Sequence, residues 1–430
     1  MVASILETIP TEFDYFTSRP IQAAITSQYD QPCGPIGTIQ PGAPIEIHIP
    51  AIHNGYRDLN NSKLEIKCRI KLADGKDIPE AAPVGPINLL LHSMFKNIEM
   101  DICGRRISDA SNFYQYRAFF ETFLSYTKQV QKTRLETEGW KKDTPGHFDD
   151  FTIDDNGKNE GHIERAERFS ESSIVVLTGR PHLDLFHQDK DIPPGCPMTL
   201  RLIPASTNFF IKKPAAHAIN YRFDIVSVRF WVRTKELTPS LQLAHDQMLM
   251  KGNNIRIPYT KVTLKHLTIP NGVTAINFDN IYQGVLPNRL LLAFLRDTTM
   301  NANENSNPFV FENLDLSFLQ LTINGETFPR YPYQPNFTTG DYIREYLGLF
   351  ETLTIDIGNR TIDLTPEDWS TTYPFFMFTT DPSGYPTLPR TGAARLELQF
   401  RNPIKHVYNI ICFAEFPSML EIDQYRNALF

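Results

Sequence analysis

Stretches in which apolar and polar residues alternate recur along the whole chain. Strict alternation over about four to eight residues is typical of a strand that buries one face and exposes the other. The sequence therefore predicts a mainly β protein, with strands at residues 45–49, 64–72, 173–177, 198–203 and 221–232 in the first half, and at 261–267, 290–296, 316–323, 375–379, 394–400 and 407–416 in the second.

One unit combines a hairpin signal with a helical pattern. Asn324-Gly325 follows the alternating residues 319–323 and is typical of a tight hairpin, because both central residues of a type I′ turn have positive φ. The segment 328–335, rich in proline and aromatic residues, is expected to form a loop, and the amphipathic pattern at 342–350 predicts a helix. We therefore expect a strand, a turn, a loop and a helix in this order.

The same order occurs earlier, with alternation up to a turn at Gly104 and a helical pattern from about Tyr114 to Glu136. Gly104 and Gly325 are 325 − 104 = 221 positions apart, about half the chain. A chain of 430 residues exceeds the size at which a single core keeps growing, so two domains of roughly 200 residues are expected. The sequence therefore predicts one β-rich design used twice.

Composition narrows the fold class. The chain contains 30 Phe, 17 Tyr and 32 Pro; aromatic residues favour half-buried sheets, and prolines favour the loops between short strands. Each half supplies about eight strands, with a helix between two of them, which suits two facing sheets with Greek-key connections. We predict an all-β fold of two tandem eight-stranded jelly rolls, a double jelly roll, with short helices in the inter-strand loops.

The same pattern predicts the domain boundaries. Residues 1–42 lack sustained periodicity and contain several prolines, so they are expected to form an arm. The charged, glycine-containing stretch near 138–171 is expected to be an inserted surface loop with one short helix. The predicted segments are an N-terminal arm at 1–42, jelly roll 1 at 43–236 with its insertion near 138–171, a linker at 237–254, jelly roll 2 at 255–418 and a C-terminal tail at 419–430.

Charge and targeting signals exclude several classes of protein. A formal net charge of −7 disfavours a protein that coats nucleic acid, which is normally basic. No apolar run approaches the roughly 20 residues needed to cross a bilayer, and the N-terminus lacks a secretory signal. The five cysteines never form a C-x-x-C pair, so free thiols in a reducing compartment are expected.

Candidate chemistry is sparse. No nucleophile elbow, P-loop, H-E-x-x-H or dinucleotide fingerprint is present in the sequence. The glycine cluster at 157–161 lacks the preceding strand that a phosphate-binding loop needs, which favours a solvated loop tip. His48 and His53 lie five positions apart, but a zinc site needs a third convergent ligand, so solvent-facing or core histidines are favoured.

Charged residues offer no clear site either. The pairs Asp149-Asp150 and Asp154-Asp155 lack the spacing of a calcium-binding EF-hand loop. Arg105, Arg106 and Arg117 could contact phosphate, but they are expected to cap carbonyls or pair with carboxylates. The possibility of a carboxylate pair for glycoside hydrolysis stays open, because a sequence does not show the distance between two carboxylates in space. We predict no catalytic, cofactor-binding or metal-binding residues and no cofactor.

Motifs of the second half carry a resemblance to a known family. They are TLKHLTIP at 263–270, GVLPNR at 284–289, NGE at 324–326, YQPNF at 333–337, YIREY at 342–346, RLELQF at 395–400 and AEFPSMLEID at 414–423. In this order they resemble the major capsid proteins of Polinton (Maverick) transposons and of adintoviruses. The resemblance is clearest from about residue 260 onward, and over the first half it rests on the order of the elements.

The resemblance implies a double jelly-roll capsid subunit like adenovirus hexon and virophage capsid proteins. Three copies would form a pseudo-hexagonal capsomer that tiles an icosahedral shell around double-stranded DNA, with loose DNA contact possible. It also implies a penton-type single jelly-roll partner, synthesis in the host cytoplasm and assembly in the nucleus. Two alternatives stay open: a paired jelly-roll enzyme (a glycan hydrolase or a copper monooxygenase), and a domesticated β-sandwich binding module. A cleft between the domains with close carboxylates or several histidines would favour the enzyme.

Overall fold

The strands of the first half form two four-stranded sheets. In this computed structural model, which describes residues 22–80, 82–108, 110–154, 157–301, 303–353, 361–380 and 390–429, one sheet has the order β1-β10-β3-β7 and the other β2-β8-β5-β6. The strands are β1 (Ile25–Cys33), β2 (Ile45–Ile49), β3 (Gly55–Leu72), β5 (Phe95–Ile102), β6 (Arg105–Arg106), β7 (Val175–Gly179), β8 (Met198–Pro204) and β10 (Tyr221–Leu237), with a small additional sheet of β4 (Gly85–Pro86) and β9 (Ile211–Lys212).

The second half repeats this plan, with sheets in the order β11-β18-β13-β16 and β12-β17-β14-β15. Its strands are β11 (Ile255–Ile269), β12 (Ala275–Val285), β13 (Arg289–Arg296), β14 (Leu316–Ile323), β15 (Glu326–Tyr333), β16 (Phe376–Thr379), β17 (Thr391–Phe400) and β18 (Tyr408–Ile422), with β19 (Ala428–Leu429) beside β18. All these strand pairs are antiparallel. The predicted double jelly roll is confirmed.

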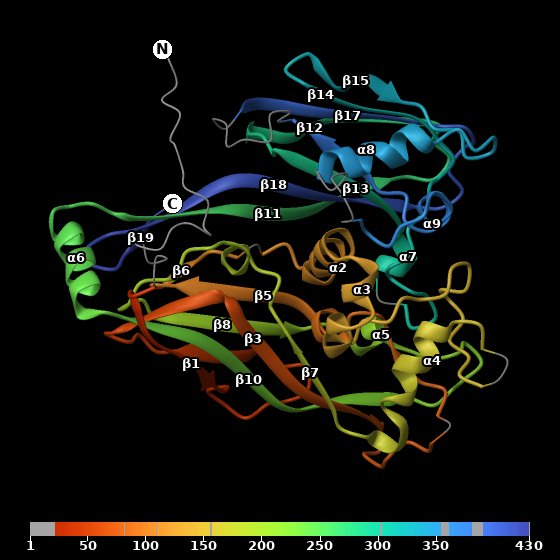
Figure 1. Ribbon diagram of the computed structural model, residues 1–430. Coiled ribbons are helices and arrows are strands. Elements are labelled where there is room, and N and C mark those ends of the chain that lie inside the picture. Colours follow the sequence, from red (N-terminus) through yellow and green to blue (C-terminus); the bar gives the residue numbers. More distant parts are fainter. Residues whose placement is uncertain are drawn as a thin grey trace, which may run out of the picture.

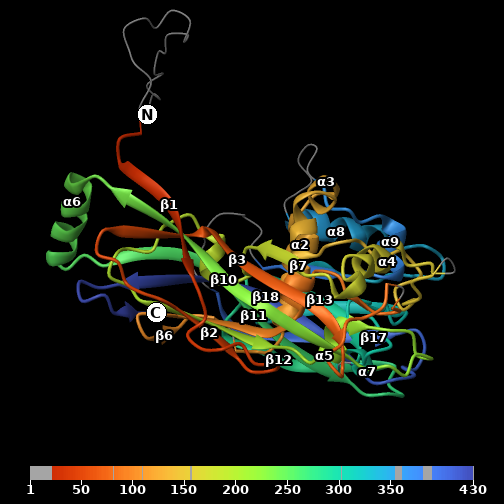
Figure 2. The same cartoon turned by 90° about the horizontal axis from the view of Figure 1, so that it is seen from below.

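Short helices connect the strands, and Figure 1 shows the two jelly rolls stacked with α2 between them. Figure 2 shows α2, α3, α4, α8 and α9 gathered on one side, whereas α6 lies at the opposite end. The helices are α1 (Leu90–Ser93), α2 (Tyr114–Ser125), α3 (Lys128–Gln131), α4 (Glu160–Glu167), α5 (Thr207–Phe210), α6 (Pro239–Met250), α7 (Asp297–Met300), α8 (Ile343–Leu353) and α9 (Pro366–Thr371), with 3-10 turns η2 (Arg134–Glu138), η3 (Ser170–Ser172) and η4 (Asp184–His187).

The burial of the strands follows their sequence pattern. In β3 the apolar residues Leu64, Ile66 and Cys68 are fully buried, while the polar residues between them are partly exposed. In β13, by contrast, every residue from Leu290 to Leu295 is buried. A continuous apolar run of this kind is typical of a strand that is covered on both faces.

The repeated unit occupies equivalent places in the two jelly rolls, as predicted. The hairpin β5–β6 ends one sheet and β14–β15 ends the matching sheet, and α2 or α8 then leads to the next strand of the facing sheet, β7 or β16. The turns have positive φ at both central residues: 51° and 76° at Cys103-Gly104, and 49° and 86° at Asn324-Gly325. This is the backbone geometry that the Asn-Gly pair indicates.

Several predictions about individual segments need correction. The segment 328–335, expected as a loop, continues β15 as far as Tyr333. Its prolines are tolerated because β15 pairs with β14 alone and lies at a sheet edge, where one row of N–H groups has no strand partner. The helix predicted at 114–136 instead breaks at Tyr126, whose backbone is extended, into α2, α3 and η2.

The ends of the chain contain strands that the pattern did not predict. Within the expected arm 1–42, residues 1–21 lie outside the described residues, whereas β1 pairs with β10 from Ile25 to Cys33. Within the expected tail, β18 continues to Ile422, which pairs with Ile255 of β11. Alternation is weak in β1 because it runs along a sheet border, where few side chains are buried. At the end of β18, by contrast, Leu420 and Ile422 are fully buried.

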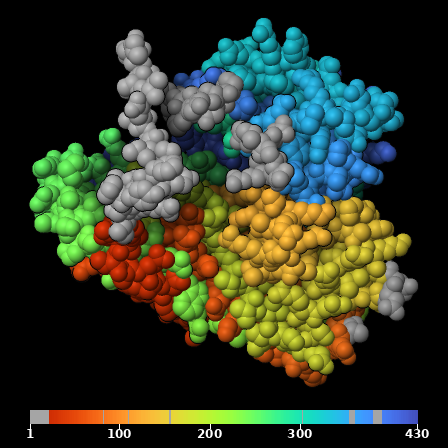
Figure 3. Space-filling model, viewed as in Figure 1, coloured from red at the N-terminus to blue at the C-terminus, as the bar shows by residue number. Residues whose placement is uncertain are grey.

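The charged segment 138–171 contains the predicted short helix, α4, but the expectation of a surface loop around it was wrong. Trp140, Phe148, Phe169 and Arg165 are all buried. The guanidinium of Arg165 forms an ion pair with Asp143 at 2.6 Å and donates hydrogen bonds to two backbone carbonyls, so its charge is compensated inside the fold. Figure 3 shows this yellow segment and the orange α2 region lying against the light-blue part of the second jelly roll.

An aromatic cluster joins the two jelly rolls. On α2, Phe119 and Phe123 are buried, and they face Phe309 and Tyr373 from the second half. The Phe119 and Phe309 rings stack with centroids 4.3 Å apart, and the Phe123 and Tyr373 centroids are 4.6 Å apart. Stacked and tilted aromatic pairs add to the hydrophobic gain of burial. The two jelly rolls therefore share a core.

The buried His162 of α4 makes the stability of this segment depend on pH. Burial lowers the pKa of His162 from 6.5 to about 3, so the unfolded chain binds one more proton between these values. We expect stability to fall as the pH drops below 6.5, by at most about 1.4 kcal/mol per pH unit from this residue. Denaturation of wild type and His162→Leu between pH 7 and pH 4 measures the difference; equal pH slopes would contradict this assignment.

Candidate functional site

The candidate residues from the sequence do not converge. His48 and His53 are both exposed, and neither joins a group of three possible metal ligands among the described residues. Arg105 donates to the carbonyl of Ala428, and Arg106 forms an ion pair with Glu99 at 2.8 Å. These arginines cap a carbonyl and pair with a carboxylate, as predicted.

The acidic residues and the glycine that the sequence offered as binding-site candidates instead make contacts with the protein backbone. The carboxylate of Asp149 accepts a hydrogen bond from the backbone N–H of Asn307, and that of Asp150 accepts from the N–H groups of Thr152 and Lys158. Asp155 lies outside the described residues. A Cβ at Gly157 would lie 2.3 Å from the carbonyl oxygen of Thr152, so this glycine permits a close approach of two backbone segments.

A group of charged and titratable side chains lies between the jelly rolls, and we call Arg117, Glu121, His182, Asp184 and His187 the interface cluster. Arg117 and Glu121 lie on α2, one helical turn apart, and the other three residues follow β7. Arg117 donates from Nε to Oε1 of Glu121 at 2.8 Å, and its Nη2 lies 2.7 Å from Oδ1 of Asp184. One buried guanidinium therefore compensates two carboxylates.

These contacts determine the charge of the cluster. Burial alone would raise the pKa of Glu121, but Arg117 and the two histidines hold it well below its usual range. Burial raises the pKa of Asp184, a rise that Arg117 opposes. Burial lowers the pKa of His182 to about 4. At neutral pH the cluster therefore holds an ionised Glu121 carboxylate beside a neutral His182 imidazole.

Both histidines face the same oxygen of Glu121. Nδ1 of His182 lies 2.7 Å from Oε2, and Nε2 of His187 lies 3.3 Å from it. The other ring nitrogen of His182, Nε2, lies 3.2 Å from the hydroxyl of Thr122. Hydrogen bonds at both nitrogens fix the orientation of the His182 ring.

A cavity of about 390 Å³ opens beside this cluster. The first jelly roll contributes the whole interface cluster to its wall, and the second contributes residues of β11, β13 and β18, among them Arg289 and Glu415. The side chain of His187 is 32% exposed, whereas that of Asp184 is only 1% exposed. The cavity is thus reached from the His187 side.

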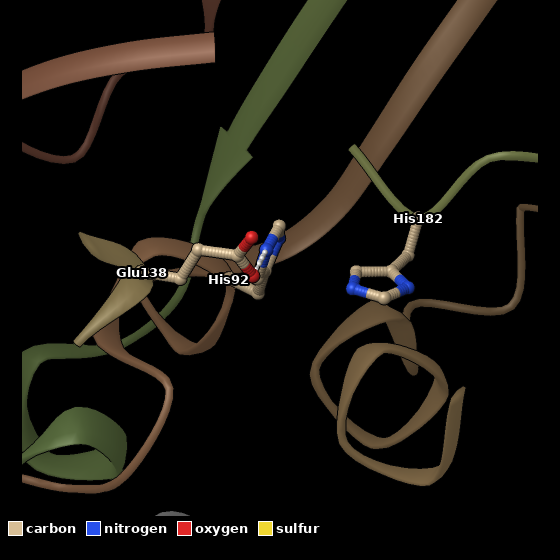
Figure 4. Close-up of side chains that lie close together, drawn as sticks. All are labelled: His92, Glu138 and His182. Carbon is tan, nitrogen blue, oxygen red and sulfur yellow. Dashed lines mark hydrogen bonds and ion pairs between the residues drawn. The ribbon is translucent and has the colours of Figure 1, made fainter. Parts of the chain in front are cut away.

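A second polar group, His92, Glu138 and His182, lies deeper (Figure 4). Nε2 of His92 lies 3.2 Å from Oε2 of Glu138, and Nδ1 lies 2.8 Å from the hydroxyl of Tyr114. That hydroxyl also accepts a hydrogen bond from the backbone N–H of His182. All three members are buried, and their bonds tie α1, η2 and α2 to the segment after β7.

Sequence reasoning missed both groups apart from Arg117, which was expected to cap a carbonyl or pair with a carboxylate and pairs with two carboxylates, those of Glu121 and Asp184. The members of both groups lie between positions 92 and 187, and His182 and His187 have the same five-residue spacing as His48 and His53, so spacing alone did not distinguish the two pairs. The one available signal was Arg117 and Glu121, whose i, i+4 spacing favours an ion pair on a helix.

The cavity between the jelly rolls has the close carboxylates and the histidines that were expected to favour the paired jelly-roll enzyme, but its carboxylates do not suit glycoside hydrolysis. That reaction needs one protonated and one ionised carboxyl group, both facing the substrate. Glu121 and Asp184 are instead held by the same guanidinium, and the side chain of Asp184 is almost completely covered.

No helix among the described residues is long and apolar enough to cross a membrane.

Comparisons with known proteins show similarity along the whole chain. No family model matches the sequence. An uncharacterised protein of Caenorhabditis elegans is 22% identical over 355 residues, which cover 80% of this chain and 81% of that protein.

Three solved structures share the fold at low sequence identity. A chain in the cryo-EM structure of the Sputnik virophage matches with a TM-score of 0.63 and 10% identity, covering 99% of this chain and 92% of that one. The Faustovirus major capsid protein matches at 0.59 and 9%, covering 97% and 92%. The mavirus major capsid protein matches at 0.51 and 8%, covering 99% and 95%. This chain therefore has, over its whole length, the double jelly-roll fold of the major capsid proteins of virophages and giant viruses.

Proposed function

We propose that this protein is a structural major capsid protein without enzymatic activity, which assembles as a homotrimer. The observation that carries the proposal is the match of the whole chain, both jelly rolls included, to virophage and giant-virus capsid proteins. Two similar jelly rolls per chain give six per trimer. A trimer is therefore pseudo-hexagonal and can tile an icosahedral shell.

The interface between the jelly rolls supports this role. The two halves of a shell subunit contact different neighbours, so they have to keep a fixed position relative to each other. The stacked Phe119 and Phe309 rings and the ion pairs of Lys142 with Asp363 and Asp368 connect the halves through both apolar and charged contacts. A trimer of such rigid subunits keeps a fixed pseudo-hexagonal outline against its neighbours.

Exposed apolar side chains supply candidate contact surfaces. Met250 of α6 is 78% exposed, and Tyr425, near the C-terminus, is 77% exposed. Obligate interfaces are larger and more apolar than the average protein surface. We assign contacts between neighbouring copies to residues 1–42, to the chain after Phe416 and to exposed apolar side chains of this kind.

The remaining parts of the proposal concern origin and partners. The second-half motifs quoted above support an affiliation with Polinton (Maverick) elements and adintoviruses. In the proposed shell, a penton-type single jelly-roll protein fills the vertices and double-stranded DNA lies inside. The net charge of −7 favours only loose DNA contact. The site of action is the virion, with synthesis in the cytoplasm and assembly in the nucleus.

Size-exclusion chromatography with light scattering tests the proposal. The chain has a mass of 49.3 kDa, so we expect a species of about three times this mass at micromolar concentration, or larger assemblies built from it. A strictly monomeric protein over the whole concentration range would contradict the capsid function. That result would favour the domesticated binding module, which shares the fold.

A further inference from the structure

We propose that the interface cavity binds a divalent transition-metal ion through Glu121, His182 and His187, with Zn²⁺ as the ion to test. The site is independent of the capsid function, since all three ligands come from one chain. One carboxylate and two imidazoles are a ligand set that zinc commonly takes in proteins, where the fourth position is left to water.

The ligand atoms already lie close together. One atom from each of the three residues lies within 4.8 Å of the other two. Around a tetrahedral zinc ion with bonds of about 2.0–2.1 Å, neighbouring ligand atoms are roughly 3.3 Å apart. Nε2 of His187 is at this distance from Oε2 of Glu121, at 3.3 Å, and Nδ1 of His182 is closer, at 2.7 Å. Binding therefore requires an outward shift of the His182 ring, with the two histidine nitrogens, which lie within 4.8 Å of each other, also reaching about 3.3 Å.

Groups behind the ligands hold them in place. Arg117 donates to Oε1 of Glu121, which leaves Oε2 to face the two histidines. Nε2 of His182 lies 3.2 Å from the hydroxyl of Thr122, so this nitrogen can carry the proton and donate a hydrogen bond to the hydroxyl while Nδ1 offers its lone pair to the metal. Metal-ligating histidines and carboxylates are commonly oriented by such outer contacts.

An unpartnered carboxylate oxygen points independently to a missing cation. Asp184 is 3% exposed and lines the cavity, and its Oδ2 has no hydrogen-bond partner among the residues that the structure describes. Burial of a carboxylate oxygen without a donor is unfavourable, and a water molecule on a bound cation would supply that donor. Glu415, on the opposite wall, has a raised pKa because of its burial, so an added positive charge would also favour its ionised form.

Three cationic side chains line the cavity and oppose the ion, Arg117, Arg180 and Arg289, and two of them are already paired with carboxylates. Arg117 contacts the carboxylates of Glu121 and Asp184. Arg289 lies 3.6 Å from Glu415. Arg180 donates hydrogen bonds to the uncharged Asn60, so carboxylates offset two of these three positive charges before any ion enters.

The deeper group of His92, Glu138 and His182 is less suited to a metal. Nδ1 of His92 is engaged by Tyr114, and the side chains of His92 and Glu138 are 0% and 5% exposed. A hydrated ion would have to lose its water before reaching them. Glu121, His182 and His187 instead border a cavity in which an ion can keep water in its coordination shell.

Isothermal titration calorimetry with ZnCl₂ and the absorption spectrum with Co²⁺ test this site. We expect the full-length protein to bind one ion per chain at pH 7.5 and to give the visible absorption of four-coordinate cobalt. His187→Ala removes an exposed ligand without opening the core, so we expect at least about tenfold weaker binding and loss of the cobalt bands.

Two further variants make the result decisive. Glu121→Gln keeps the shape of the ligand and should also weaken zinc binding, while His48→Ala removes an exposed histidine outside the cavity and should leave it unchanged. Circular dichroism verifies that each variant is folded. Wild-type protein that binds no zinc, or that binds it no more tightly than His187→Ala, would overturn the proposal.

Discussion

Phe119→Ala is expected to lower the free energy of unfolding by about 3–5 kcal/mol, the usual cost of removing a buried phenylalanine. Phe119 is 1% exposed, and its ring stacks on Phe309 of the second jelly roll at 4.3 Å. The substitution leaves a cavity in the core that both jelly rolls share. Urea denaturation followed by tryptophan fluorescence measures the change, since Trp140 lies 5.9 Å from the Phe119 ring.

Tyr331→Ala is the matched control. This aromatic side chain is 73% exposed on β15, so we expect a change within about 0.5 kcal/mol. If the two variants had equal denaturation midpoints, the aromatic cluster would not hold the jelly rolls together. If Phe119→Ala split one transition into two, the jelly rolls would unfold separately once the shared core is weakened.

Arg165→Met is expected to have a comparable effect, about 3–5 kcal/mol, because it leaves the buried Asp143 carboxylate without its cationic partner. Both side chains are only 3% exposed, and they lie 2.6 Å apart. Asp143 also accepts a hydrogen bond from Asn307 of the second half, so the loss should weaken the contact between the halves. Thermal denaturation of the purified variant measures the shift.

Two comparisons separate this effect from a general loss of charge. Asp143→Leu in the Arg165→Met background removes the uncompensated carboxylate, so the double variant should be more stable than the sum of the two single effects. Arg395→Met breaks the exposed ion pair with Asp279 and should cost about 0–1 kcal/mol. Equal losses in Arg165→Met and Arg395→Met would show that the segment 138–171 is not anchored through Arg165.

The fold was largely predictable because its strands are half-buried and therefore alternate. The turn at Asn324-Gly325 was predictable for a different reason, since positive φ at two successive residues is compatible with few residue types. The edge strand β15 was missed because its prolines indicate a loop unless the sheet edge is known. The strand β1 was missed because few of its side chains are buried.

Buried charge was the main property that the sequence did not reveal. Arg165 and Asp143 look like surface residues in a charged segment until the fold brings them together and removes both from water. The interface cluster is similar, because Glu121 and His187 are 66 positions apart (187 − 121) and meet only through the packing of α2 against the segment after β7. The spacing of residues in the sequence indicates contacts within one helix or strand. The contacts of Arg165 with Asp143 and of Glu121 with His187 join different segments, so spacing does not indicate them.

Electron microscopy of the purified full-length protein tests the central claim most directly. A capsid subunit built from two similar jelly rolls predicts particles made of three chains with a pseudo-sixfold outline, and closed shells under conditions that favour assembly. Images that contain only single two-lobed molecules, at every concentration and salt condition tried, would contradict the proposed capsid function.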